Sequence, residues 1–327
     1  MNSACDRIRV ARLPCREAAA APRGGQGVRL VAVGSIGLDA IETPFARRED
    51  LLGGSLSFAC AAASFFAPVG MVGVVGDDFP QRHLARYRRF GIDLQGLARA
   101  QGKTFRWSGI YDADMINRRT LSTELNVFQA FSPQIPAAYR RAPFLLLGNI
   151  SPELQLRVLA QMERPRFVAA DTMDLWINTA RAGLLRVIRR ANLLTLNDGE
   201  ARLLAGRHNL RDCAETIAAW GPQYVVIKKG EHGAMLVSRS GVFLAPAYPV
   251  RRLHDPTGAG DAFAGGLMGV LAGRRQVTER AVRAALLCGS VVASFGVEDF
   301  SIARLERLTR RDIEERLAEL KRMIRAG

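Results

Sequence analysis

Short apolar segments alternate with helical patterns along most of this chain, and that alternation limits the possible folds more than any other feature. Strands that are apolar on both faces need cover on both sides, and intervening helices supply it. Apolar runs predict strands at 29–33, 70–75, 144–147, 167–170, 193–196, 224–228 and 234–237. Helical spacing of apolar residues predicts helices at 55–66, 81–90, 152–162, 179–190, 198–204, 211–220, 259–272, 278–294 and 311–324. The pattern indicates an α/β fold, a three-layer α/β/α sandwich with a mostly parallel central sheet.

One region departs from this alternation. Residues 104–111 and 119–126 form two extended runs joined by a short polar turn, which favours antiparallel strands over helices. We expect these strands to belong to a small β lid, contributed by residues 40–50 and 103–130. The lid would be part of a single domain that spans residues 28–327.

The charge balance needs an explanation of its own. The chain carries 46 basic and 31 acidic residues, a formal net charge of +15, which is an excess that nucleic-acid-binding proteins also have. However, 42 of the basic residues are arginines, they are spread along the chain, and no basic block alternates with aromatic residues. This distribution is more typical of a genomic codon preference than of a phosphate-binding stripe. We therefore expect no nucleic-acid partner, although the positive charge favours small anions such as nucleotides.

Two segments of the chain indicate whether the protein enters a membrane or is secreted. Residues 53–76 are uncharged and long enough to cross a bilayer, but they are rich in Gly, Ala and Ser and are divided by Pro68, which favours a buried helix and a buried strand. Residues 1–27 lack the apolar core of a signal peptide, which predicts a disordered N-terminal extension.

The five cysteines are scattered and form no C-x-x-C pair, which indicates reduced thiols. We expect a cytoplasmic protein without membrane contact, either a monomer or a homodimer.

The most informative string is HDPTGAGDAFAGG at 254–266. A turn that contains Gly258 and Gly260 leads into a helix that is apolar nearly all round. Small residues at a helix start leave its free N–H groups open to an anion, and the helix dipole favours negative charge there. Asp261 on the first turn would repel a phosphate if binding were the only role. Two interpretations stay open: Asp261 accepts a proton from a substrate hydroxyl beside a transferring phosphoryl group, or the string is a plain helix cap.

This string resembles the C-terminal signature of the ribokinase-like (PfkB-type) carbohydrate kinases. Further segments occur in the order that the family has: VAVGSIGLD at 31–39, the pair Gly53-Gly54, VGVVGDD at 72–78, NDGE at 197–200 and KKGEHG at 228–233. The resemblance covers residues 29–296. It implies a ribokinase-like sandwich with a lid, and a kinase that uses ATP and Mg²⁺. It also favours the catalytic interpretation of Asp261 over the cap.

The resemblance implies roles for the residues at the start of the last apolar helix. Asp261 matches the general base that takes the proton of the acceptor hydroxyl. The main-chain amides of Gly258, Ala259 and Gly260 match an anion hole for the charge on the transferring phosphoryl group.

The resemblance also implies a nucleotide and metal site. Asn197 and Glu200 match the element that arranges Mg²⁺ through its waters, although a capping box at a helix start has the same pattern and the two can coexist. Lys228 and Gly230 match a nucleotide contact at a strand end, and strand-end solvation is the alternative. Asp255 matches a loop residue linked to a monovalent cation such as K⁺, although Asp before Pro is also a common turn.

On the acceptor side, Asp39 matches a carboxylate that accepts hydrogen bonds from sugar hydroxyls. Gly53 and Gly54 match a turn that brings the backbone close to the substrate, and a plain loop-to-helix turn is the alternative. Asn149 and Asp171 end apolar strands, where ligands of α/β proteins commonly bind.

One position departs from the family. Many of its sugar kinases have Asn four residues beyond the second glycine, where this chain has Phe58. The change removes a polar contact and adds an apolar wall, so we expect an acceptor that is less hydroxylated, bulkier or differently oriented than ribose. Trp107 and Tyr111 in the lid and Trp176 are candidates for stacking surface, although such aromatics more often belong to a core.

The residues and the resemblance together predict an enzyme that moves the γ-phosphate of MgATP to an alcohol of a sugar or sugar-like molecule. A nucleoside or cyclitol kinase on the same fold is the first alternative. A catalytically silent nucleotide- or sugar-binding regulator is the second. The sequence contains neither a G-x-x-x-x-G-K-[S/T] loop nor an H-R-D catalytic loop, which argues against P-loop and protein kinases.

Overall fold

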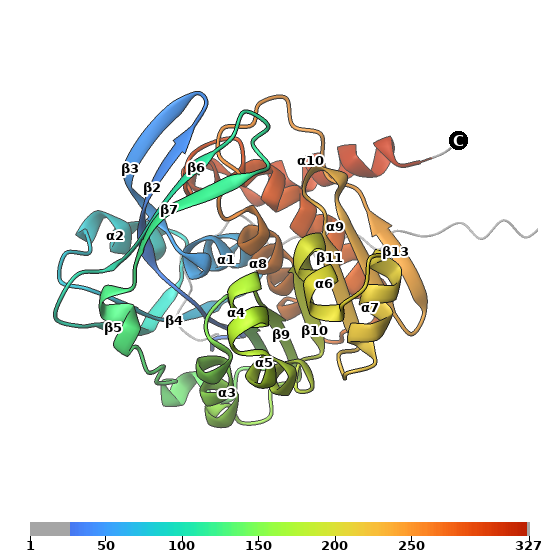
Figure 1. Ribbon diagram of the computed structural model, residues 1–327, viewed down its shortest axis with the longest axis horizontal. Helices are drawn as coiled ribbons and strands as arrows, with labels where there is room; N and C mark the ends of the chain where they lie inside the picture. Colours follow the sequence, from blue (N-terminus) through green and yellow to red (C-terminus); the bar gives the residue numbers. More distant parts are fainter. Residues whose placement is uncertain (1–26, 326–327) are drawn as a thin grey trace, which may run out of the picture.

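The centre of the structure is a nine-stranded sheet, which the computed structural model shows within the described residues 27–325 (Figure 1). Seven neighbouring strands are parallel, and β12 and β13 extend the sheet by antiparallel pairing. In spatial order the strands are β13 (Gly241–Ala245), β12 (Ala234–Ser238), β11 (Tyr224–Lys228), β10 (Leu193–Asn197), β9 (Phe167–Asp171), β8 (Phe144–Leu147), β1 (Leu30–Val33), β4 (Val69–Val75) and β5 (Asp93–Arg99).

Helices cover both faces of this sheet, and each layer closes its own apolar core. One layer is made of α1 (Ser55–Ser64), α2 (Gln81–Arg89), α8 (Ala259–Ala272), α9 (Glu279–Gly296) and α10 (Arg310–Met323). The other is made of α3 (Pro152–Gln161), α4 (Asp174–Thr179), α5 (Arg181–Ile188), α6 (Asp198–Ala205) and α7 (Leu210–Ala218). The predicted three-layer α/β/α sandwich is therefore confirmed.

A second, four-stranded sheet projects beyond one end of the first (Figure 1). Its order is β3 (Ala46–Gly53), β2 (Gly37–Thr43), β6 (Phe105–Tyr111) and β7 (Arg118–Glu124), with β2 and β6 parallel and the outer pairs antiparallel. Ile41, Tyr111 and Met115 form a small buried cluster beneath it, against which Leu253 and Phe300 of the main body pack. This cluster attaches the small sheet to the segments that flank α8.

Glycines in α8 set the position of its N-terminus. A Cβ atom on Gly265 would lie 2.1 Å from the carbonyl oxygen of Ala59, and one on Gly269 would lie 2.6 Å from that of Ala63. The backbones of α1 and α8 can approach this closely only because these positions lack side chains. The contact fixes the axis of α8, and its first turn consequently reaches the edge of the sheet where β9, β10 and β11 end.

Most predicted elements are present with shifts of one or two residues at their ends. The segment 53–76 is α1 followed by β4, as expected, and within the described residues no helix is long and apolar enough to cross a membrane. The edge strands β5 and β13 and the short helix α4 were not predicted. The predicted extension at 1–27 lies outside the described residues except for Gly27.

Candidate active site

Polar and charged side chains from three parallel strands meet the first turn of α8 at the carboxyl edge of the main sheet. Asp171 ends β9, Asn197 ends β10 and Lys228 ends β11. Because α/β proteins bind ligands outside the carboxyl ends of parallel strands, this edge is where a ligand site is expected. The small sheet extends over the same end of the molecule.

The turn before α8 is built on Gly258, which has a φ of 75° in the left-handed region. A Cβ atom there would also lie 2.3 Å from the ring of Phe58, which is 3% exposed. Phe58 therefore supports this turn from the core, and it could contact an acceptor only if its ring moved. This placement differs from the expected apolar wall that faces the acceptor.

The three amides expected to form an anion hole are not equivalent. The amide of Ala259 donates to the carbonyl oxygen of Pro256 at 3.2 Å, so it is already used by the turn. The amides of Gly258 and Gly260 have no main-chain acceptor among residues 27–325. Two of the three predicted donors are therefore free to bind an anion at this helix start, and the helix dipole also favours negative charge there.

Asp261 lies on the first turn of α8 and is half-buried. Burial and the nearby carboxylate of Asp171 raise its pKa to about 7, against the opposing effect of the charges of Lys228 and Arg118. A carboxylate with a pKa near neutrality is a better proton acceptor than an ordinary aspartate at the same pH. Its position and its pKa both suit a general base.

Lys228 is the centre of a charge cluster. Its ammonium group lies 3.1 Å from Oδ2 and 3.3 Å from Oδ1 of Asp171, and a Cβ atom on Gly260 would lie 3.2 Å from it. Burial alone would lower the pKa of Lys228, but the carboxylates of Asp171, Glu200 and Asp261 outweigh burial and raise it. Lys228 is therefore a permanent cation against the helix start. Asp171, expected on the acceptor side, is instead the partner of this lysine.

Asn197 and Glu200 form a full capping box at the start of α6. Oδ1 of Asn197 accepts from the amide of Glu200 at 2.7 Å, and the amide of Asn197 donates to Oε2 of Glu200 at 2.7 Å. Burial, with a smaller effect of Asp171, raises the pKa of Glu200 to about 7, although Lys228 opposes the shift. Within residues 27–325 no three His, Cys, Asp or Glu side chains form a metal-binding cluster. These residues fit an ion that is held mainly by phosphate and water, because the cap uses one oxygen of each side chain.

Asp39 on β2 lies against the turn that the sequence assigned to substrate. A Cβ atom on Gly53 would lie 1.9 Å from Oδ2 of Asp39, so the carboxylate occupies the space above this glycine. The amide of Gly54 lies near enough to stabilise the ionised form of Asp39, but Oδ1 is buried and has no hydrogen-bond partner in the described part of the chain. Burial, followed by the charge of Asp255, raises the pKa of Asp39 to about 7. An unpartnered buried carboxylate oxygen is a site for a donor that a ligand supplies.

Gly54 needs to be glycine for a separate reason. Its φ is 83°, and a Cβ atom would lie 2.5 Å from the carbonyl oxygen of Ser35. The chain turns sharply here to enter α1, and it brings its backbone next to Asp39 as it does so.

Asp255 is buried in the loop that precedes Gly258. Its Oδ1 accepts from the amide of Thr257 at 2.9 Å, whereas its Oδ2 has no partner among residues 27–325. Burial raises the pKa of Asp255. The loop is tied to the small sheet by a 3.0 Å hydrogen bond between the hydroxyl groups of Tyr111 and Thr257. A buried oxygen without a partner fits a monovalent cation.

Two other residues singled out in the sequence lie at this edge. Asn149 follows β8 and accepts from the indole N–H of Trp176 at 3.0 Å, while its amide nitrogen lies 3.2 Å from the sulfur of Met173. Its side chain is thus engaged by the α4 segment. Gly230 follows β11 with a φ of 55°, and nothing lies within 4 Å of a Cβ atom placed there. The loop is open at that point.

The sequence did not indicate Arg118. This residue begins β7 and lies over the ring of Trp107 at 5.4 Å, and its charge opposes the rise that burial causes in the pKa of Tyr111. Its positive charge also opposes the rise in the pKa of Asp39 and of Asp261, so it lies near both carboxylates. One arginine among 42 in an arginine-rich chain gives no signal by itself.

Three comparisons bear on this geometry. The model of the pfkB family of carbohydrate kinases matches residues 38–299. A cytidine kinase of Thermococcus kodakarensis is 32% identical over 247 residues, which are 73% of this chain and 87% of that protein. Among solved structures, the nucleoside kinase of Methanocaldococcus jannaschii has a TM-score of 0.73 at 19% identity, covering 90% of this chain and 100% of that one. The nucleoside kinase of Burkholderia thailandensis with inosine has a TM-score of 0.72 at 22% identity, covering 89% and 97%.

Proposed function

Because the chain belongs to the pfkB family of carbohydrate kinases and is an ATP-dependent kinase, we propose that its acceptor is a nucleoside and that Asp261 is the general base. The observation that carries the proposal is the convergence of Asp261, the free amides of Gly258 and Gly260, and Lys228 at one helix start. A proton acceptor, anion donors and a fixed cation are the groups that phosphoryl transfer to an alcohol requires.

The choice of a nucleoside rests on two supports. The cytidine kinase is the relative with 32% identity over most of both chains. In addition, Asp39 and Trp107 are paired in register on the neighbouring strands β2 and β6. The free oxygen of Asp39 would accept from a ribose diol, and the half-buried indole of Trp107 would offer an apolar surface to the base.

In the proposed mechanism, Asp39 and the Gly53-Gly54 turn hold the acceptor so that its hydroxyl points to Asp261. Asp261 takes the hydroxyl proton as the oxygen attacks the γ-phosphoryl group. The amides of Gly258 and Gly260 and the helix dipole stabilise the charge that spreads over the transferring group.

Lys228 neutralises the phosphate chain from the end of β11, and its pairing with Asp171 holds the ammonium group at this point. Arg118 would add positive charge from the small sheet when that sheet covers the acceptor, and cover would exclude water from the transfer. Mg²⁺, when bound with ATP, neutralises and orients the phosphates. Its waters would donate to Oε1 of Glu200, which the cap leaves free, and to the second lone pair of Oδ1 of Asn197.

Asp255 is proposed to bind a monovalent cation such as K⁺ beneath the anion loop. The buried Oδ2 without a partner supports this role. The expected result is a rise in kcat when K⁺ replaces a large organic cation, and Asp255→Asn should lose that response. Equal rates in both salts for the unchanged protein would contradict the assignment.

A sugar or cyclitol acceptor is the second candidate, because a carboxylate such as Asp39 binds any vicinal diol. A screen of ADP release distinguishes the two, with cytidine, uridine, adenosine, inosine, ribose and myo-inositol as acceptors and Asp261→Asn as the background. We expect kcat/KM for a nucleoside to exceed that for ribose at least tenfold. A preference for ribose or inositol would refute the nucleoside proposal. ADP release with none of the acceptors would instead favour a silent regulator.

A further inference from the structure

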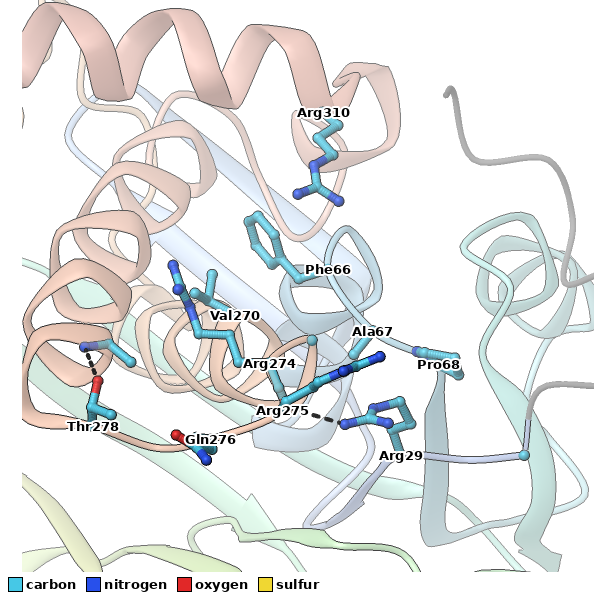
Figure 2. Close-up of a pocket in the computed structure, with 13 residues that line it drawn as sticks. Arg29, Phe66, Ala67, Pro68, Val270, Arg274, Arg275, Gln276, Thr278 and Arg310 are labelled. Atoms are coloured by element: carbon cyan, nitrogen blue, oxygen red, sulfur yellow. Dashed lines mark hydrogen bonds between the residues drawn. The ribbon is translucent and has the colours of Figure 1, made fainter. Parts of the chain in front are cut away.

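A hollow lies at the end of α8 that is far from Asp261. It has a volume of about 870 Å³ and is lined by residues around the start of β1 and β4, the end of α8 and the start of α9 and α10. Figure 2 shows four arginines around it, Arg29, Arg274, Arg275 and Arg310. Because α8 has 14 residues, its two ends are about 21 Å apart. This hollow, the arginine pocket, is therefore separate from the candidate active site.

Among the described residues, the lining of the arginine pocket contains no carboxylate. The guanidinium of Arg29 donates to two main-chain oxygens, those of Ala272 at 2.7 Å and Arg274 at 3.2 Å. These bonds hold the side chain in place and leave its charge without a counterion in the described structure. Arg310 alone among the four pairs with an acid within residues 27–325, at 3.1 Å from Glu314. Three guanidinium charges are therefore without an acidic partner in the described part of the chain.

Arg274 has a buried hydrogen-bond donor without a partner in the described part of the chain, which is further evidence that the pocket binds an anion. Its Nε atom is buried and has no hydrogen-bond partner among residues 27–325. Leaving a buried charged donor unpaired is unfavourable, and an anion in the pocket would remove that penalty. Arg166 binds the carbonyl oxygen of Arg275, so the loop that carries both arginines is held from the other side as well. The Arg29 guanidinium and the main chain of this loop are thus held in place before a ligand arrives, which lowers the cost of binding one.

The shape and the remaining wall define the ligand class. Pockets of 300–1,000 Å³ are typical of small-molecule sites, and this one also has the apolar side chains of Phe66 and Val270 in its lining, with the Arg310 guanidinium over the Phe66 ring at 5.8 Å. Planar guanidinium groups match phosphate oxygens in pairs. We propose that the arginine pocket binds a small multivalent phosphate anion, either an inorganic oligophosphate or a nucleotide whose base lies on the apolar wall. The proposal does not depend on which acceptor the kinase uses.

Hydrogen–deuterium exchange of the full chain, with and without inorganic tripolyphosphate in Mg²⁺-free buffer, tests this site locally. We expect slower exchange in the segments 66–68 and 270–281, whatever happens at 258–262. Calorimetry should then show at least tenfold weaker binding at this site for Arg274→Gln and for the exposed Arg275→Gln. Arg186→Gln on α5, an exposed arginine far from the pocket, is the matched control. A second arm with ATP distinguishes the two phosphate sources, because a base on the apolar wall would make ATP bind more tightly.

Two results would overturn the proposal: no protection at 270–281 with either probe, or protection that survives both substitutions. Arg275→Gln alters an exposed side chain, so it tests the site even if Arg274→Gln fails to fold. Unchanged ADP release in both variants is expected. It separates this site from the candidate active site, and a failure here leaves the proposed function untouched.

Discussion

Replacing Asp39 by Asn should make the protein more stable at high pH, and the effect follows from the structure. Burial raises the pKa of Asp39 from 3.8 to about 7. In the unfolded chain the carboxyl ionises near its ordinary pKa, so between pH 4 and 7 the folded state binds more protons than the unfolded state. Stability therefore falls as pH rises through this window and levels off above pH 7. Asparagine has no charge to bury, so the variant escapes this loss.

The raised pKa of Asp39 also sets how much the free energy of unfolding changes with pH. Each pKa unit corresponds to about 1.4 kcal/mol, and from pH 5 to the folded pKa there are two units, which gives about 3 kcal/mol. Urea unfolding followed by tryptophan fluorescence, at pH 5 and pH 8, measures the free energy of unfolding of both proteins. We expect the advantage of Asp39→Asn to grow by about 3 kcal/mol between these values. Asp261 and Glu200 titrate in the same window, but they do so in both proteins and largely cancel.

The control is Asp112→Asn, which changes an exposed aspartate in the turn between β6 and β7. The difference in the free energy of unfolding between Asp112→Asn and the unchanged protein should be the same at pH 5 and pH 8. If the advantage of Asp39→Asn were also independent of pH, the carboxylate would not be buried with an unpartnered oxygen as described, and the reasoning would be refuted. The same variant should lose acceptor binding, because the amide presents a donor where a carboxylate oxygen now accepts.

Two further comparisons test the packing around the candidate site. Gly258→Ala should lower the free energy of unfolding by about 2–4 kcal/mol in urea titrations, because of its φ of 75° and its contact with Phe58. The open Gly230→Ala should cost about 1 kcal/mol, and equal losses would argue against the contact. Lys228→Met should destabilise the protein by about 3 kcal/mol, because it leaves the buried carboxylate of Asp171 unpaired. Adding Asp171→Asn should recover most of that stability without restoring the KM for ATP, and recovery of both would remove Lys228 from the nucleotide site.

The sequence predicted the layers of the fold because the inner strands are apolar on both faces. Strand β8 (Phe144–Leu147) and strand β11 (Tyr224–Lys228) have the bounds expected of them. Strand β5 was missed because it lies at the edge of the sheet and has a half-exposed sequence, DLQGLAR, with no apolar run. Strand β3 was expected only as part of a lid, since its charged stretch ARRED has no strand pattern. Pairing with β2 makes it a strand, and pairing across a sheet is not local information.

The site residues divide in the same way. Asp261 and Gly258 could be found because their motif is contiguous and is carried by one helix start. The pairing of Asp171 with Lys228 could not, because residues 57 positions apart meet only when β9 and β11 flank β10. Phe58 was misplaced for a related reason. Its place in the sequence marks the acceptor turn, but helical geometry turns its ring beneath Gly258.

The central claim is that Asp261 takes the acceptor proton at the start of α8 during phosphoryl transfer. Rapid-quench measurement of a single turnover, with ATP and the best nucleoside saturating, compares Asp261→Asn with the unchanged protein. The claim predicts a transfer rate at least ~100-fold lower in the variant, with the Kd for ATP changed less than threefold. It also predicts that the rate of the unchanged protein rises with pH through about 7, as Asp261 ionises. A transfer rate in Asp261→Asn equal to that of the unchanged protein would contradict the claim.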